Sequence, residues 1–271
     1  MKKLLILAIV AILIIAPLAG CSATTGNREK INIKLGVNGA EHQVWDYVQK
    51  KLAEENIELE IISFSDYVRP NLALAEGEID ANAFQTIAYF DQFKADHNLD
   101  LVSIGNTILA PMAIYSEKLK SLDEVKEGDK VALPNDATNG GRGLILLQSA
   151  GLITLKEGVG LIPTIKDVVE NPKNLELIEL AATQIPRSLA DVDIAIINNG
   201  VAIEADFSPT EDSIFIEDAS SEDAKPYINI IAVKSKDKDK EALKRLVEIY
   251  QEEATKEVID EVYKGNVVPA F

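Results

Sequence analysis

The chain has 271 residues, of which 27 are basic and 44 acidic, so its formal net charge at pH 7 is −17. So acidic a composition argues against a nucleic-acid partner, which needs clustered basic residues. A single cysteine leaves no disulfide within the chain, and the fold must therefore be stabilised by an ordinary apolar core.

The first 20 residues have the layout of a secretory signal peptide, with two lysines followed by an apolar run at 4–16. That run is shorter than the ~20 residues of a membrane-spanning helix. It leads to Leu-Ala-Gly-Cys, which resembles the bacterial lipobox and implies cleavage before Cys21 and acyl chains, such as palmitate, on that cysteine. The polar residues up to 30 predict a flexible tether. An ordinary signal peptide with an incidental cysteine is the alternative.

From residue 31 onward, strand and helix patterns alternate. The alternation favours an α/β fold with mostly parallel sheets flanked by helices. Strands are predicted at 31–37, 57–61, 79–84, 99–104, 111–115, 130–133, 192–197 and 228–233, and helices at 44–52, 70–76, 89–93, 143–150 and 238–264.

No enzymatic machinery is visible in the sequence. His42 and His97 are far apart and lack an HExxH motif or a cysteine companion, so a zinc site is poorly supported. There is no G-x-S-x-G elbow, and the glycines at 140–143 lack the lysine and Ser/Thr of a P-loop. We expect no metal, no cofactor and no catalytic residue, although a Ser-His-Asp set spread along the chain stays open.

The polar stretch at 134–143 predicts an anion-binding loop. A strand ends there, and an apolar helix is predicted to begin with Arg142 in its first turn. Free backbone N–H groups at a helix start attract an anion, whereas an arginine alone opposes the helix dipole. A ligand carboxylate bound by the guanidinium would pair with the free N–H groups and would also offset the unfavourable position of the arginine charge. The alternative is a surface arginine beside glycines that serve only the turn.

Three stretches carry a specific resemblance: FSDYVRPNLALAEGEIDANAFQ (64–85), PNDATNGGR (134–142) and PRSLADVD (186–193). They resemble the NlpA/MetQ family, the lipid-anchored substrate-binding proteins of methionine ABC importers, and the likeness runs from residue 31 to the C-terminal VVPAF. It implies a two-lobed periplasmic-binding-protein fold, type II-like, with two hinge crossings, near residues 110 and 234. Lobe 1 would comprise 31–110 and 235–271, and lobe 2 would comprise 111–234.

The resemblance also implies a binding site in the interlobe cleft. The family's carboxylate-binding arginine corresponds to Arg142, and its pocket residues correspond to Tyr67, Phe84 and Tyr89 on one lobe and Asn139 and Asn198 on the facing lobe. The aromatic rings would pack against an apolar side chain, and a thioether sulfur contacts aromatic edges favourably. Core packing is the alternative for Tyr67 and Phe84, and loop formation is the alternative for Asn198.

The chain departs from the family's pattern around this site. Thr86 stands where methionine binders carry histidine, and Gly200 and Val201 replace an Asn-Tyr pair. At position 69 the family commonly has a neutral residue, whereas Arg69 adds a charge that is expected to lie near the cleft. A polar site discriminates between ligands because a wrong ligand leaves some of the site's hydrogen-bonding groups unpaired. Since these groups differ here, the identity of the ligand stays open among methionine, another amino acid and a short peptide.

The sequence therefore predicts an exported lipoprotein on the extracytoplasmic face that delivers a small zwitterion to an ABC permease. It predicts a monomer that is not an enzyme. Whether the anchor lies in a plasma membrane or in a two-membrane envelope stays open. One alternative is a surface lipoprotein acting as an adhesin or interaction module without a small ligand. Another is an enzyme on the same scaffold, which would require a reactive group in the cleft with an adjacent base, such as His42 beside a hydroxyl.

Overall fold

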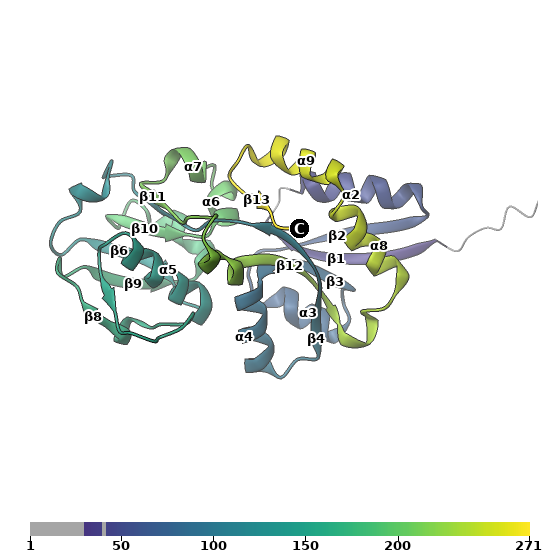
Figure 1. Ribbon diagram of the computed structural model, residues 1–271, viewed down its shortest axis with the longest axis horizontal. Coiled ribbons are helices and arrows are strands. Elements are labelled where there is room, and N and C mark those ends of the chain that lie inside the picture. Colours follow the sequence, from purple (N-terminus) through teal and green to yellow (C-terminus); the bar gives the residue numbers. More distant parts are fainter. Residues whose placement is uncertain (1–29, 40–41) are drawn as a thin grey trace, which may run out of the picture.

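The computed structural model describes residues 30–39 and 42–271. The predicted signal peptide, Cys21 and all but the last residue of the tether lie outside the described residues. The described chain forms two lobes, each built on a sheet with helices packed against it (Figure 1). Within these residues, no helix combines the length and the apolar character needed to cross a membrane.

Lobe 1 is built on a six-stranded sheet with the order β13-β4-β12-β3-β1-β2. Strand β1 is parallel to β2 and β3, whereas β12 is antiparallel to both β3 and β4, and β13 is antiparallel to β4. The elements of this lobe are β1 (Ile31–Asn38), α2 (Gln43–Glu54), β2 (Ile57–Phe64), α3 (Arg69–Glu76), β3 (Ala81–Thr86), α4 (Ile87–His97), β4 (Leu101–Leu109), β12 (Ile228–Lys234), η5 (Ser235–Asp237), α8 (Glu241–Tyr250), α9 (Glu253–Tyr263) and β13 (Val268–Pro269).

Lobe 2 is built on a five-stranded sheet with the order β11-β5-β10-β6-β9. Strand β6 is parallel to β9 and β10, and β5 is antiparallel to β10 and β11. Its elements are β5 (Ala113–Tyr115), η1 (Leu122–Glu124), β6 (Lys130–Pro134), α5 (Ala137–Ser149), β7 (Thr154–Leu155), η2 (Ile165–Asp167), β8 (Val168–Glu170), β9 (Glu176–Leu180), η3 (Ala182–Ser188), β10 (Ile194–Ile197), α6 (Asn199–Glu204), α7 (Pro209–Asp212) and β11 (Phe215–Ile216), and η4 (Glu222–Tyr227) leads back to lobe 1.

The α/β, two-lobed architecture is confirmed, but two details of the prediction are wrong. Both sheets are mixed rather than mostly parallel. The reason is that β4 carries the chain out of lobe 1 and β12 carries it back beside β4, so the two must run in opposite directions. Because β12 belongs to the first sheet, the second crossing lies before residue 228 rather than near residue 234.

Each lobe has its own apolar core. In lobe 1, α2, α8 and α9 cover one face of the sheet, and α3 and α4 cover the other (Figure 1). In lobe 2, Leu147 of α5 packs with Leu133 and Ile196 on one side of the sheet. The long helix predicted at 238–264 is two helices, α8 and α9, which are separated at residues 251–252.

The lobes also meet away from the two covalent crossings, at the loop between α9 and β13. The backbone carbonyl of Asn266 accepts a hydrogen bond from Nδ2 of Asn199 at 2.7 Å. Its side-chain Oδ1 accepts hydrogen bonds from Thr210, from the backbone N–H at 3.0 Å and from Oγ1 at 2.8 Å. The C-terminal segment of lobe 1 thus holds the start of α6 and the start of α7 in lobe 2.

Gly140 allows the end of β6 to lie against the first turn of α5. A Cβ atom at Gly140 would lie 2.7 Å from the carbonyl oxygen of Pro134, a backbone atom that cannot move away easily. At Gly143, in the same helix, the nearest atom to an added Cβ is a side-chain carbon of Ile196 at 3.4 Å, which is an ordinary contact. Substitution by alanine is therefore expected to have different effects at the two glycines.

We predict that Gly140→Ala lowers the free energy of unfolding by more than ~1 kcal/mol, because the overlap with the backbone outweighs the gain of ~0.5–1 kcal/mol in helix propensity. Gly143→Ala is the matched control, and should be neutral or stabilising by up to ~1 kcal/mol. Urea denaturation measures both values. Equal effects of the two substitutions would contradict this account of the strand–helix packing.

Candidate functional site

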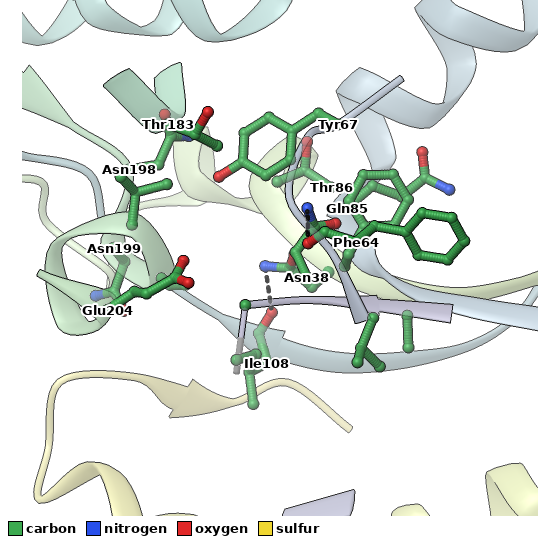
Figure 2. Close-up of a pocket in the computed structure, with 18 of the residues that line it drawn as sticks. Asn38, Phe64, Tyr67, Gln85, Thr86, Ile108, Thr183, Asn198, Asn199 and Glu204 are labelled. Atoms are coloured by element: carbon green, nitrogen blue, oxygen red, sulfur yellow. Dashed lines mark hydrogen bonds between the residues drawn. The ribbon is translucent and has the colours of Figure 1, made fainter. Parts of the chain in front are cut away.

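A cavity of about 530 Å³ lies between the two lobes. This volume falls within the ~300–1,000 Å³ of small-molecule sites. Its wall includes the carboxyl ends of β1, β2 and β3 from lobe 1, and the segments after β6 and β10 from lobe 2. Ligands of open α/β sheets bind at this end of the parallel strands. Figure 2 shows wall residues from both lobes facing a common space.

Three aromatic rings of lobe 1 form one side of the cavity. The centroids of Tyr67, Phe84 and Tyr89 lie 6.0–6.1 Å from one another. The hydroxyl of Tyr89 donates to the backbone carbonyl of Tyr67 at 2.9 Å. Burial raises the pKa of both tyrosines, and the nearby charge of Asp136 raises it further, so both stay protonated at neutral pH. The result is a neutral surface with apolar faces.

Thr86 lies in the cavity wall and caps a helix. Its Oγ1 accepts a hydrogen bond from the backbone N–H of Tyr89 at 3.1 Å, in the first turn of α4. Next to Thr86, Gln85 also lines the cavity, and its buried side chain bonds with those of Asn71 and Asn82, which bond to each other, at 2.7–2.9 Å. Because these amides satisfy one another, the end of β3 is held in one arrangement.

On the facing lobe, a carboxylate sets the orientation of two asparagines. Asp136 accepts from Nδ2 of Asn139 at 3.0 Å, so the Oδ1 atom of Asn139 points away from it. That Oδ1 accepts from Nδ2 of Asn198 at 2.7 Å. The Oδ1 atom of Asn198 is then left buried, with no donor among the described residues. Asn139 and Asn198 therefore contact each other, and both line the cavity.

The structure corrects the predicted position of Arg142. Helix α5 begins at Ala137 and is capped by Asp136, which accepts from the backbone N–H of Asn139 at 2.9 Å. Arg142 therefore lies in the second turn, and the argument from free N–H groups at the helix start does not apply to it. The prediction failed because the polar first turn, Ala-Thr-Asn-Gly-Gly, has the composition of a loop. Arg142 does line the cavity.

The guanidinium of Arg142 is paired with Glu217, and its side chain is only 4% exposed. Its Nε donates to Oε1 of Glu217 at 2.7 Å, and its Nη2 donates to Oε2 of the same carboxylate and to the carbonyl oxygen of Ala110 at 3.0 Å. The ring of Tyr227 lies 4.3 Å from Cζ. Oε2 of Glu217 also accepts from the backbone N–H of Met112 at 2.7 Å. Both chain crossings thus contact this one ion pair.

Several wall residues were not predicted from the sequence. Asn38, Glu204 and Asn229 line the cavity, and Nδ2 of Asn229 donates to the carbonyl oxygen of Ile108 at 3.2 Å. An asparagine within the otherwise apolar run at 228–233 was the signal available for Asn229. Nothing local marks Asn38 or Glu204, because each becomes a wall residue only when the lobes meet. Arg69, by contrast, lies outside the wall and pairs with Glu78 at the surface, at 3.3 Å.

The structure also brings a histidine beside a hydroxyl, which the sequence did not show. Nε2 of His42 lies 2.6 Å from Oγ of Ser63. Ser63 is exposed and lies outside the cavity wall. Among the described residues, no carboxylate hydrogen-bonds to His42. No group of three or more His, Cys, Asp or Glu side chains in the described part of the chain is arranged to hold a metal ion.

Residues 33–271 match the model of the NlpA lipoprotein family. The chain belongs to this family. The D-methionine-binding lipoprotein MetQ of Salmonella typhimurium is 47% identical over 258 residues, which cover 94% of this chain and 93% of that protein. A crystal structure of the methionine-binding protein MetQ matches with 48% identity and a TM-score of 0.84, over 89% of this chain and 98% of the other.

A second solved structure extends the comparison to a ligand-bound relative. The nutrient-binding protein of Burkholderia cenocepacia, bound to methionine, is 44% identical with a TM-score of 0.84. The match covers 88% of this chain and 100% of that protein. The two-lobed NlpA fold is therefore shared over the whole described body.

We predict that Glu217→Ala lowers the free energy of unfolding by ~3–5 kcal/mol, because it leaves the buried Arg142 unpaired. The double variant Arg142→Met, Glu217→Leu should lose less than Glu217→Ala alone, since no buried charge remains. Guanidinium denaturation followed through Trp45, the only tryptophan, measures these changes.

The exposed pair Arg69–Glu78 provides the control, with side chains 50% and 56% exposed. Glu78→Ala should cost less than ~1 kcal/mol. A similar loss for Glu78→Ala and Glu217→Ala would show that burial is not what makes the Arg142 pair important.

Proposed function

We propose that this NlpA-family protein is the substrate-binding protein of an ABC importer, and that it takes methionine or a related amino acid or short peptide into the interlobe cavity. The observation that carries the proposal is the cavity itself, which combines a neutral aromatic wall on lobe 1 with oriented polar groups on lobe 2. Relatives named as methionine-binding proteins support the same ligand class.

The two sides of the cavity suit the two ends of such a ligand. Tyr67, Phe84 and Tyr89 would bury an apolar side chain, and aromatic rings favour a thioether sulfur by ~0.3–1.5 kcal/mol. Arg142 and Asn198 would hold the polar end. The hydrogen bonds of Arg142 to Glu217 and Ala110 use Nε and Nη2, so a ligand carboxylate would be bound through Nη1. Hinge closure would bring both sides onto the ligand.

The departures from the family's pattern bear on which ligand is bound. The hydroxyl oxygen of Thr86 already caps α4, so Thr86 has fewer hydrogen-bonding groups left for a ligand than a histidine would have. Val201 is buried in the core of lobe 2 and cannot replace the hydrogen bonds of a tyrosine. A cavity of about 530 Å³ does not exclude a dipeptide by volume.

The anchor and the partners complete the proposal. Acyl chains on Cys21 would hold the protein at the extracytoplasmic face, and the loaded protein, a monomer, would pass its ligand to a membrane permease. Its role is binding rather than catalysis, which agrees with relatives that are named for binding.

We predict that the mature protein binds L-methionine and that Asn198→Ala weakens binding by roughly 5- to 100-fold, because a buried partner is removed from the ligand at a cost of ~1–3 kcal/mol. Calorimetry on protein unfolded and refolded to remove co-purified ligand measures both affinities. Native mass spectrometry before refolding should detect the bound small molecule.

Asn32→Ala is the matched control, since Asn32 is exposed on β1 and lies outside the cavity wall. Its affinity should equal that of the wild type. No co-purified small molecule, together with no binding of methionine by the refolded wild type, would overturn the proposed function.

A further inference from the structure

The turn that follows α9 has a fixed backbone, and Asn266 is its last residue. Helix α9 ends at Tyr263, and the next two residues, Lys264 and Gly265, have positive φ angles of 49° and 86°. The backbone N–H of Lys264 donates to the carbonyl oxygen of Asp260 at 2.9 Å, and that of Asn266 donates to the carbonyl oxygen of Tyr263 at 2.9 Å. A left-handed residue that ends a helix turns the chain sharply, so Asn266 projects from the helix end instead of continuing it.

Both oxygens of Asn266 accept hydrogen bonds from lobe 2. Its Oδ1 accepts from the backbone N–H and Oγ1 of Thr210, at 3.0 and 2.8 Å, and from Oγ of Ser208 at 3.4 Å. Its backbone carbonyl accepts from Nδ2 of Asn199 at 2.7 Å. A backbone N–H can only donate, so the bond from Thr210 fixes which end of the Asn266 amide faces lobe 2. One residue of lobe 1 thus binds four donors of lobe 2.

After Asn266 the chain returns at once to the sheet of lobe 1. Strand β13 pairs with the end of β4, and the backbone N–H of Ala270 donates to the carbonyl oxygen of Thr107 at 3.0 Å. The ring of Phe271 lies 5.7 Å from that of Tyr250 in α8. Asn266 is therefore fixed to lobe 1 on both sides, by α9 before it and by β13 after it.

The contact lies on the cavity side of the first crossing between the lobes. Strand β13 pairs with the last residues of β4, directly before that crossing. Asn199 and Val267 both line the cavity, and Asn199 is only 3% exposed. A rotation that widens the cavity at this place moves α6 away from Val267. The bonds from Asn199 and Thr210 to Asn266 must then lengthen or break.

We propose that Asn266 is a latch, a third and non-covalent link that favours the closed arrangement of the two lobes. Because opening breaks its bonds, the latch raises the closed population of the ligand-free protein. A ligand enclosed between the lobes leaves only after they open, so the latch also slows release. This second consequence rests on the proposed function, whereas the first does not. Asn266 lies outside the cavity wall, so its effect on binding comes through the conformation of the protein.

The first test measures opening without ligand. Spin labels at Lys50→Cys in α2 and Glu176→Cys in β9, which are exposed on different lobes, report the interlobe distance by double electron–electron resonance. Asn266→Ala should raise the ratio of open to closed protein at least threefold. Asn266→Asp keeps an acceptor for Thr210 and should keep the wild-type ratio. Thr210→Val removes one of the same bonds from the lobe 2 side and should also raise the ratio.

The second test measures release of L-methionine by stopped-flow fluorescence of Trp45, which lines the cavity. Asn266→Ala should speed release by roughly 3- to 30-fold, as expected for the loss of two or three hydrogen bonds that only the closed form makes. Asn266→Asp should change the rate less than twofold.

Asn171→Ala is the matched control for a general loss of stability. It also removes two side-chain hydrogen bonds, from Nδ2 to the carbonyl oxygen of Leu175 at 3.0 Å and from the Leu175 N–H to Oδ1 at 2.9 Å, but both lie within lobe 2. It should keep the wild-type ratio of open to closed protein and the wild-type release rate.

The outcomes separate the latch from the proposed function. An unchanged distance distribution in both Asn266→Ala and Thr210→Val overturns the latch, whatever their stability. An equal change in Asn171→Ala or in Asn266→Asp also overturns it, because the bonds to Thr210 would then not be the cause. If the distances change as expected but methionine binds to neither the wild type nor the variants, the latch stands and the proposed ligand is wrong.

Discussion

The pairing of Arg142 with Glu217 is the interaction on which the arrangement of the two lobes depends. Removing two charges from water is costly unless each keeps its hydrogen bonds. Here the carboxylate accepts from Nε, from Nη2 and from the backbone of Met112, and the guanidinium also donates to Ala110 and stacks on Tyr227. These partners lie on both crossings between the lobes. The pair therefore holds the two hinge segments against α5 while it lines the cavity.

The polar groups of the cavity are oriented by residues behind them. Asp136 orients Asn139, which orients Asn198, and on lobe 1 two backbone carbonyls orient Asn38. Both ends of the Asn139 amide are used in this way, whereas the Oδ1 atoms of Asn38 and Asn198 have no donor among the described residues. Side chains held in one orientation need less ordering when a ligand binds. The contacts of Asn266 with Asn199 and Thr210 connect the lobes beside this cavity, so the shape of the site and the closure of the cleft are linked.

Much of the fold could be predicted from local patterns. The apolar alternation of β1 and β2 and the helical spacing of α2 depend only on neighbouring residues, and all three elements are present. Sheet direction could not be predicted, since the same alternation suits a parallel or an antiparallel strand. The start of α5 was missed for a related reason: Asn139 and Gly140 favour a loop, but Asp136 caps the helix and the close contact with Pro134 requires a glycine.

The sequence by itself determined the α/β class, the relationship to NlpA lipoproteins and the aromatic members of the cavity wall, because these reside in short motifs. Only the tertiary structure decided that Arg142 has an internal partner 75 residues away, and that Glu204 lies against the backbone of Gly39 across the cleft. Such contacts join segments that are distant in the chain and belong to different elements. Their existence depends on how the sheets twist and how the two lobes close, and no local spacing of residues encodes that geometry.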